Sequence, residues 1–211
     1  MVPNWTTRNE RLIDREKYIY DWIETFEENS LFYDVGACLG HFGAFAAYRG
    51  HRVVFFEAGY QNARNICEQL NHDEFRDWTV QLERKPVWSS ATQVGWVDDQ
   101  PEPGGHRKFV KMDCYIGDPR NVHLNNEANP EVTRPSTCLK DWPSADYIKI
   151  DVDGGEQEVI KGMDAESWAK VKGLCIEIHK NFPISIPQFK VVDEREVESG
   201  LLNVFYKRLE R

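Results

Sequence analysis

The stretch LFYDVGACLGHFGAFAAYRGHRVVFFEA, residues 31 to 58, decides the fold. Its apolar runs predict a short strand over 31–36 and a second strand over 52–58. The residues between them predict a turn rich in glycine and a helix that ends at Gly50, because glycine commonly follows the last turn of a helix. A strand, a helix and another strand in this order indicate two parallel strands joined by a right-handed crossover.

The same alternation continues toward the C-terminus. The segment QNARNICEQLN is typical of a helix, and WTVQLERKPVWSS contains a third strand region. Residues 146–152 predict a strand that leads into a helix, and GLCIEIH and LLNVFYKRL predict one strand each. We therefore predict an α/β fold with a doubly wound, mostly parallel sheet and a C-terminal antiparallel strand. The segments TQVGWVD and RKFVKMD predict an inserted hairpin, since the residues between them favour turns.

The composition narrows the class of protein. The chain has 211 residues, enough for one sizeable hydrophobic core, so we expect a single domain over 1–211. Its net charge of −9 disfavours binding to a phosphate backbone, and no nucleic-acid partner is expected. No apolar run approaches the ~18 residues of a membrane span, and no signal peptide is visible, so we expect no membrane partner and a cytoplasmic location. The cysteines number five and include no CxxC pair, which disfavours a disulfide framework and a structural zinc site.

Two segments stand apart from the alternating pattern. Residues 8–28 place apolar residues at helical spacing among charges, so we expect an amphipathic helix within an N-terminal helical segment, 1–30. Residues 114–137 are polar and contain several prolines. A connection of this length without secondary structure is usually functional or disordered, and we predict a lid loop.

The glycine loop DVGACLGHFG follows a strand and opens a helix, the place where an open α/β sheet binds its ligand. Its glycines do not have the GxGxxG spacing of a dinucleotide site, and Cys38 occupies the position where pyrophosphate would approach the backbone. No GK[ST] follows, which excludes a Walker loop. The loop therefore favours a ligand without phosphate groups.

Two carboxylates flank this loop. Asp34 ends the first strand, and Glu57 ends the second, where an acid binds ribose hydroxyls in nucleotide-binding α/β proteins. S-adenosylmethionine meets these demands, because it has a ribose, no phosphate and a cationic sulfonium. In the structural alternative, Asp34 caps the following helix and Glu57 is a solvated strand end.

The same residues support a family resemblance. The stretch at 31–58 resembles the first motifs of class I S-adenosylmethionine-dependent methyltransferases. The segment TCLKDWPSADYIKIDVDGGEQEVIKGM, residues 137 to 163, resembles the hallmark of the FkbM-type family, roughly KIDVEGxExxVLxG, and CIEIHK is similar to the family's next strand. The resemblance covers 31–60 and 136–180 well and 79–112 loosely. It implies a Rossmann-like class I methyltransferase fold and S-adenosylmethionine as cofactor.

The resemblance assigns cofactor-binding residues in the glycine loop, at the end of the second strand and in the third strand region. They are Asp34, Gly36, Ala37, Gly40, Glu57, Ser89 and Ser90. It implies that the glycine loop lines the methionine part of the cofactor and that Glu57 holds its ribose. It also implies that the chain at Ser89 and Ser90 lies next to the adenine. The chain departs from the family pattern at Cys38, where asparagine is common, at His41, where an aromatic residue is common, and at Asp153, where the hallmark has glutamate.

Two of the predicted strands carry charged residues along one face. In residues 146–152 isoleucines alternate with Lys149 and Asp151, and GLCIEIH repeats this design with Glu177 and His179. If the two strands are neighbours, their carboxyl ends bring Asp151, Glu177 and His179 to one crevice beside the glycine loop, and these three are the predicted catalytic residues. An ion pair of Lys149 with Asp151 or with Glu177 is the structural alternative, since buried charges need partners.

Methyl transfer to an alcohol requires a positioned hydroxyl and a group that accepts its proton. His179 suits the role of base, because imidazole is largely neutral at pH 7, and Asp151 suits either orienter or base. Two carboxylates and an imidazole could also hold magnesium or manganese. No ligand spacing singles out a metal, so we predict no metal site and do not favour a divalent cation.

The predicted function is therefore S-adenosylmethionine-dependent O-methylation of a hydroxyl on a small molecule or glycan. The choice of a hydroxyl rests on the family resemblance. Two alternatives stay open: N-methylation on the same fold, and a non-catalytic binding module that retains the fold. The oligomeric state is open as well.

Overall fold

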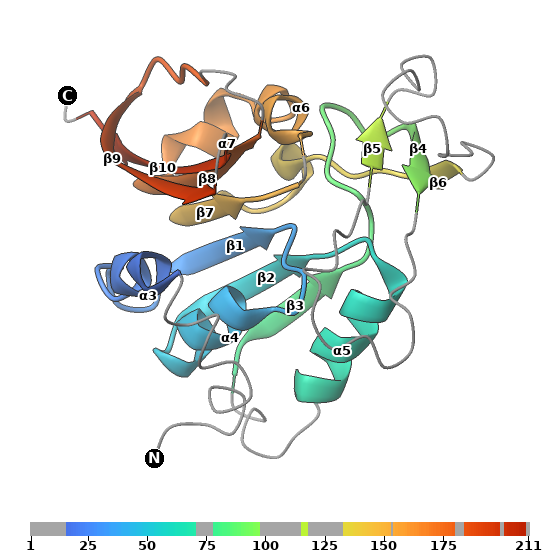
Figure 1. Cartoon of the computed structure of the whole chain (residues 1–211), viewed down its shortest axis with the longest axis horizontal. Helices are drawn as coiled ribbons and strands as arrows, with labels where there is room; N and C mark the ends of the chain where they lie inside the picture. Colours follow the sequence, from blue (N-terminus) through green and yellow to red (C-terminus); the bar gives the residue numbers. More distant parts are fainter. Residues whose placement is uncertain are drawn as a thin grey trace.

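Seven of the strands that the structure describes form one sheet, in the order β3-β2-β1-β7-β8-β10-β9 (Figure 1). This computed structural model describes residues 16–70, 78–97, 115–117, 133–152, 154–179, 184–198 and 201–209. The strands are β1 (Leu31–Val35), β2 (Arg52–Phe56), β3 (Val80–Glu83), β7 (Tyr147–Ile150), β8 (Gly173–His179), β9 (Phe189–Glu198) and β10 (Leu201–Arg208). Strands β3, β2, β1, β7 and β8 are parallel, and β10 is antiparallel to both β8 and β9. The prediction of a doubly wound, mostly parallel sheet with a C-terminal antiparallel strand is confirmed.

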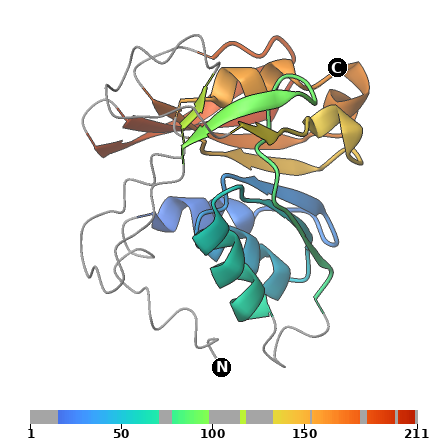
Figure 2. The same cartoon turned by 90° about the vertical axis from the view of Figure 1, so that its right-hand side faces the viewer.

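Helices cover both faces of the sheet. They are α3 (Lys17–Ile23), α4 (His41–Tyr48), α5 (Tyr60–Leu70), α6 (Glu156–Lys161) and α7 (Ala165–Ala169), with a short 3-10 turn at Leu139–Asp141. Apolar side chains of α3, α4 and α5 pack on the face that carries Phe32 and Phe55, whereas α6 and α7 pack on the face that carries Val35 and Ile150. Figures 1 and 2 show α6 and α7 well separated from the other three helices. Among the described residues, none of the helices is both long and apolar enough to cross a membrane.

A small antiparallel sheet is inserted between β3 and β7. It has the order β5-β4-β6, formed by β4 (Gln93–Val97), β5 (Tyr115–Gly117) and β6 (Thr133–Pro135). The first arm of the predicted hairpin coincides with β4, but the second arm, 107–113, lies outside the described residues. Figures 1 and 2 place this sheet on the side to which the carboxyl ends of β1 and β7 point.

Two other predicted segments are described only in part. The helix expected over 8–28 is present as α3, and residues 1–15 lie outside the described residues. Within the segment expected to form a lid, 114–137, only β5 and the residues from Thr133 onward are described. The lid therefore stays a prediction.

Strand β9 is an element that the sequence analysis did not predict. Only one strand was expected after GLCIEIH, and the structure has two. Strand β9 lies at the edge of the sheet and pairs, among the described strands, with β10 alone. Both faces of an edge strand can be solvated, and Val191 and Val192 are 47% and 52% exposed, so β9 lacks the apolar alternation that identifies a half-buried strand.

The turn after β1 is held tightly against the end of β7. Gly36 has a φ of +76°, which favours glycine, and its N–H donates to the carbonyl of Phe56 at 2.9 Å. A Cβ atom on Gly36 would lie 1.7 Å from the backbone oxygen of Asp151. The glycine loop and the carboxyl end of β7 are therefore in backbone contact.

This contact predicts different costs for two glycine-to-alanine substitutions. Gly50 also has a positive φ, +89°, but nothing lies within 4 Å of a Cβ there. Gly50→Ala should lower the free energy of unfolding by about 1 to 2 kcal/mol, the cost of the left-handed conformation. Gly36→Ala adds a clash with backbone and should cost roughly 3 kcal/mol or more. Urea denaturation measures both, and equal losses would contradict the close approach of Asp151 to Gly36.

Candidate active site

The glycine loop joins β1 to α4 and is bound to the end of β2. The N–H groups of Gly36 and Ala37 both donate to the carbonyl of Phe56, at 2.9 and 3.1 Å. Gly40 and Cys38 have φ values of +77° and +52°, so the loop turns sharply around a non-glycine residue in the left-handed region. The loop has the compact backbone expected of a ligand-binding turn at this edge of an α/β sheet.

Glu57 follows β2 directly and is buried, with 5% of its surface exposed. Its carboxylate accepts hydrogen bonds from the N–H of Cys38 at 2.7 Å and from the N–H of Gly59 at 2.6 Å. Burial raises the pKa of Glu57 to about 7. The two backbone hydrogen bonds and a hydrogen bond with the Asn62 side chain act in the opposite direction. Glu57 thus links the glycine loop to the start of α5 and titrates close to neutral pH.

Asp34 lies beneath α4 and has no exposed surface. One carboxylate oxygen accepts from the N–H of Gly43 at 2.9 Å, and the other has no hydrogen-bond partner within the described part of the chain. Burial raises the pKa of Asp34, against the attraction of Lys149. The carboxylate therefore supports the first turn of α4, and direct contact with the cofactor stays a prediction.

The charged residues of β1, β7 and β8 lie on one face of the sheet. Asp34 is opposite Lys149, and Lys149 is opposite Cys175 in the next strand. Lys149 donates to the carboxylate of Asp151 at 2.9 Å, so the ion pair of the structural alternative is present. The lysine side chain is 2% exposed and the Asp151 side chain 27% exposed. The pair is therefore buried at the ammonium and open at the carboxylate.

The charge of Lys149 is maintained by its neighbours. Burial alone would lower the pKa of Lys149, but the carboxylates of Asp151, Asp34 and Glu177 outweigh burial and raise it. The ammonium also lies 5.0 Å from the centre of the Phe42 ring, a favourable cation–π geometry. The neighbouring carboxylates therefore favour the charged form of Lys149 in the middle of the sheet.

Glu177 is held by a side chain that the sequence analysis missed. Asn203 of β10 lies opposite Glu177, is fully buried and donates to its carboxylate at 3.2 Å. The same amide donates to the hydroxyl of Tyr18 in α3 at 3.1 Å, and burial raises the pKa of Tyr18 to about 12. A polar residue inside the apolar run LLNVFYKRL was the signal that could have identified Asn203, because buried amides need partners.

His179 is the last residue of β8 and pairs with Leu201. Strand alternation predicts that it shares a face with Glu177, while its side chain lies outside the described residues. Strands β7 and β8 are neighbours in the structure, with Ile150 opposite Ile176. Asp151 and Glu177 are the next residues after these two, so both lie toward the carboxyl ends of these strands. Among the described side chains, no group of His, Cys, Asp or Glu residues is arranged to hold a metal ion.

The turn of the FkbM-like hallmark is stabilised by Glu156. This residue is 4% exposed, and its carboxylate accepts from the N–H of Gly154 at 2.9 Å. Ser89 hydrogen-bonds to Glu158 of α6, and the carbonyl of Ser90 accepts from the hydroxyl of Ser136 at 2.8 Å. The serines thus lie beside α6 and β6, and their predicted role next to adenine is not tested by these contacts.

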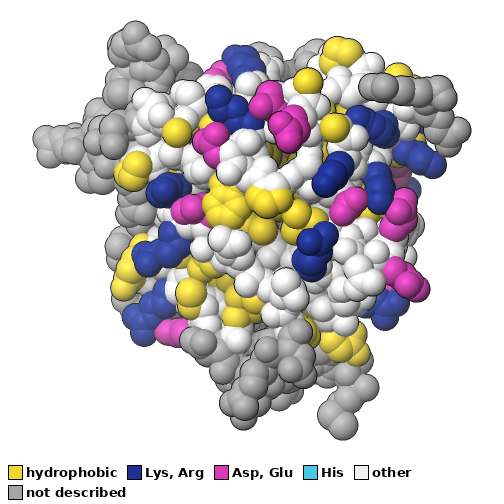
Figure 3. Space-filling view, turned by 180° about the vertical axis from the view of Figure 1, so that it is seen from behind, with side chains coloured by type: hydrophobic (Ala, Val, Ile, Leu, Met, Phe, Trp, Pro, Cys, Tyr) yellow, Lys and Arg dark blue, Asp and Glu magenta, His cyan; other side chains and the backbone are white. Residues whose placement is uncertain are grey.

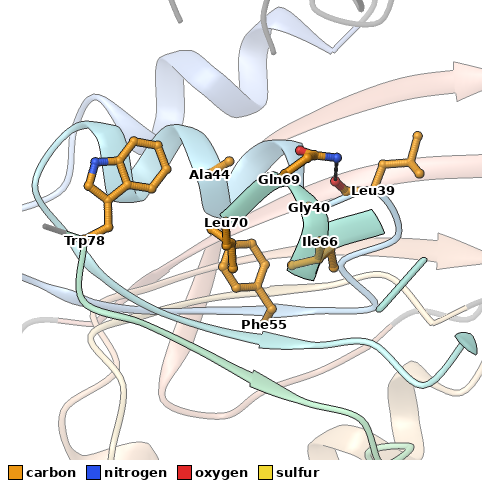
Figure 4. A pocket seen from close by; sticks show the side chains of 8 residues that line it. All are labelled: Leu39, Gly40, Ala44, Phe55, Ile66, Gln69, Leu70 and Trp78. Carbon is orange, nitrogen blue, oxygen red and sulfur yellow. Dashed lines mark hydrogen bonds between the residues drawn. The ribbon is translucent and has the colours of Figure 1, made fainter. Parts of the chain in front are cut away.

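A small cavity lies between the glycine loop, α4 and α5. Figure 4 shows Phe55, Ile66 and Trp78 around it, and Gln69 donates to the carbonyl of Leu39 at 3.4 Å. The volume of the cavity is about 10 Å³. That space is enough for about one water molecule, so this cavity is not the cofactor site.

Comparisons with known proteins agree with this geometry. The family model described as "Methyltransferase FkbM domain" matches residues 34–196. No match was found among curated proteins.

Solved structures with a similar fold include a candidate methylase from Haemophilus influenzae, with 16% identity, coverage of 93% of this chain and 98% of that chain, and a TM-score of 0.58. Magnesium protoporphyrin IX methyltransferase from Synechocystis PCC 6803, with bound S-adenosylmethionine, has 8% identity, coverage of 99% and 86%, and a TM-score of 0.55. A candidate tRNA methyltransferase from Streptococcus pneumoniae, in complex with S-adenosyl-L-methionine, has 10% identity, coverage of 92% and 72%, and a TM-score of 0.50. At these identities the likenesses show the fold, which is that of class I methyltransferases.

Proposed function

We propose that this chain, which belongs to the FkbM methyltransferase domain family, transfers a methyl group from S-adenosylmethionine to a hydroxyl of a small molecule or glycan. Family membership, over residues 34–196 of 211, establishes an S-adenosylmethionine-dependent methyltransferase. The acceptor, the chemistry at the acceptor atom and the residue roles are our proposal.

The residues at the glycine loop fit the cofactor. Two of the four buried side-chain atoms without a hydrogen-bond partner in the described part of the chain lie on or beside this loop. They belong to Asp34 and to His41 at the start of α4. Buried polar atoms usually have partners, so a polar ligand is expected here. Glu57 would hold the ribose, and Asp34 with the backbone of Gly36 and Gly40 would support the methionine part.

One observation carries the proposed acceptor site: the backbone of Asp151 is in direct contact with the glycine loop. The N–H of Asp151 donates to the carbonyl of Val35 at 2.9 Å, and its own carbonyl packs against Gly36. An acceptor in this crevice would therefore lie next to the cofactor methyl. Lys149 holds the carboxylate in place, and the Asp151 side chain stays 27% exposed.

These groups suit an in-line displacement by an alcohol. The cofactor, when bound, supplies a methyl group already activated by a sulfonium. Asp151 would orient the acceptor hydroxyl, His179 would accept its proton as the oxygen–carbon bond forms and the carbon–sulfur bond breaks, and Glu177 would fix the imidazole. No step in this scheme requires a metal ion.

The distribution of charge supports a small acceptor rather than a nucleic acid. The chain carries a net charge of −9, and on the face seen in Figure 3 basic side chains are interspersed with acidic ones. Backbone binding to nucleic acid relies on a field of positive charge. A small molecule or glycan that enters the crevice would avoid this requirement.

The pKa of Glu57 predicts how cofactor affinity depends on pH. Ribose hydroxyls donate most strongly to the ionised carboxylate, and Glu57 ionises near pH 7 in the free protein. Affinity for the product S-adenosylhomocysteine should therefore rise roughly tenfold from pH 6 to pH 8 and then level off. Calorimetry across this range is the measurement. Glu57→Gln should bind more weakly and lose the pH dependence, while Glu83→Gln at the end of β3 should keep it; a flat wild-type profile would contradict the ribose role of Glu57.

The proposed reaction is tested by turnover with labelled S-adenosylmethionine and a panel of sugars and small alcohols, each with its matching amine. Transfer to alcohols is expected. Asp151→Asn and His179→Ala should each reduce the rate by ~10² or more, because they remove orientation and proton acceptance, and should leave S-adenosylhomocysteine affinity nearly unchanged. Asp193→Asn, the same change on an exposed part of β9, is the control and should have no effect.

Three results would count against this scheme. Normal turnover by both variants would make the charged strand faces structural. Transfer to amines but not to alcohols would identify an N-methyltransferase. Failure to bind S-adenosylhomocysteine would favour the non-catalytic module.

A further inference from the structure

Asn203 carries a side-chain amide within the apolar run of β10, and both its nitrogen and its oxygen have partners. The residue has no exposed surface. Its nitrogen donates to the carboxylate of Glu177 at 3.2 Å and to the hydroxyl of Tyr18 at 3.1 Å, and its oxygen accepts from the thiol of Cys175 at 3.7 Å. A carboxylate only accepts hydrogen bonds, so the amide nitrogen must face Glu177. Contacts with β8 and α3 therefore fix the orientation of this buried amide.

Glu177 depends on such a donor because its carboxylate is buried. The residue is 8% exposed and lies directly opposite Asn203 in the pairing of β8 with β10. Lys149 attracts this carboxylate as well, but its ammonium is shared with Asp34 and with Asp151, to which it donates a hydrogen bond. A hydrogen bond has a preferred direction, which a shared charge lacks. Asn203 therefore helps to set the direction in which the Glu177 carboxylate points.

Helix α3 covers the face of the sheet on which these groups lie. Ile19 and Ile23 of this helix pack in one cluster with Cys175, and strand alternation places Glu177 on the same face. The ring of Tyr18 meets the ring of Phe205 edge-on, with centroids 6.0 Å apart, while its hydroxyl accepts from Asn203. Apolar packing alone would not require this hydroxyl. The helix is thus joined to the charged face by a polar contact in addition to its packing.

Two of the side chains in this bridge lie outside the residues that the family model matches, 34–196. Tyr18 precedes the match and Asn203 follows it, whereas Glu177 lies within it. One element before the match and one after it therefore converge on a single acid of the candidate site.

We propose that Asn203 is a positioning residue of the active site, whose amide holds the Glu177 carboxylate where it fixes the imidazole of His179. Tyr18 keeps the amide in that orientation. The inference rests on the proposed function, in which Glu177 fixes the group that accepts the proton. Both residues act through Glu177, and α3 becomes part of the active site rather than a separate packing element.

Asn203→Leu and Tyr18→Phe test the bridge while nearly preserving the size of each side chain. Leucine cannot donate to Glu177, so the rate of methyl transfer should fall roughly tenfold, with an unchanged KM for S-adenosylmethionine. Tyr18→Phe removes only the hydroxyl and keeps the ring on Phe205, so a smaller loss of about threefold is expected. Tyr48→Phe, at an exposed position of α4, is the control and should have no effect.

Asn203→Asp separates positioning from packing through its dependence on pH, because it keeps the shape of the side chain and replaces the amide by an acid. While the two carboxyl groups share a proton, the new acid can still donate to Glu177. As pH rises the shared proton is lost, and two carboxylates repel each other. Lys149, Tyr18 and Cys175 face the pair in both proteins. The rate relative to wild type should therefore fall roughly tenfold from pH 6 to pH 8.

A second control isolates the effect of the added acid. Gln81→Glu replaces an amide by an acid at an exposed position of β3. This position is remote from β8 in the order of the sheet. Its rate relative to wild type should stay constant over the same pH range.

The measurement is transfer of label from S-adenosylmethionine to the alcohol of the panel that wild type methylates fastest, together with thermal melting of each variant at each pH. Rates are compared per folded molecule. A constant ratio for Asn203→Asp, or normal rates in Asn203→Leu and Tyr18→Phe, would overturn the inference; if Asp151→Asn is slow in the same assay, the proposed function stands. Lower melting temperatures with normal rates would indicate packing alone. If wild type methylates no alcohol, the proposed function fails, and the inference fails with it.

Discussion

A single buried ammonium, that of Lys149, makes the charged face of this sheet possible. Carboxylates from β1, from β8 and from Asp151 just after β7 lie around it, and their combined attraction raises its pKa although it is buried. Without the cation, the carboxylates of Asp151, Asp34 and Glu177 would lose this opposite charge, and isolated buried charges are strongly disfavoured. Helix α4 adds the ring of Phe42 over the ammonium, so the helix that follows the glycine loop also contacts this charge.

The ion pair of Lys149 with Asp151 also supports the glycine loop of the candidate active site. Lys149 donates a hydrogen bond to the carboxylate of Asp151, and the backbone of Asp151 packs against the turn at Gly36. The glycine loop in turn donates to Glu57 through Cys38. Groups that would bind the ribose and groups that would orient the acceptor are therefore joined by a short chain of direct contacts, which is the preorganisation that a displacement reaction needs.

Much of this arrangement is predictable from the sequence, because it depends on patterns local to each strand. Alternation of strands and helices predicts the parallel sheet, and the strand order of a doubly wound sheet makes β7 and β8 neighbours. Asp151 and Glu177 were the two ion-pair partners expected for Lys149 in the structural alternative, and the structure shows the pair with Asp151. Other features depend on which elements meet in space. Strand β9 is solvated at the sheet edge and lacks apolar alternation, and Asn203 becomes meaningful only when β10 pairs with β8. Asn62 is one polar residue in a polar helix until folding buries it beside Glu57.

We propose that cofactor and acceptor meet between Glu57 and the end of β7. A crystal structure with S-adenosylhomocysteine bound tests it most directly. We expect the ribose hydroxyls to lie within hydrogen-bond distance of the Glu57 carboxylate and the sulfur to face the crevice beside Asp151. A product bound at another edge of the sheet, or a sulfur that points away from Asp151, would contradict it.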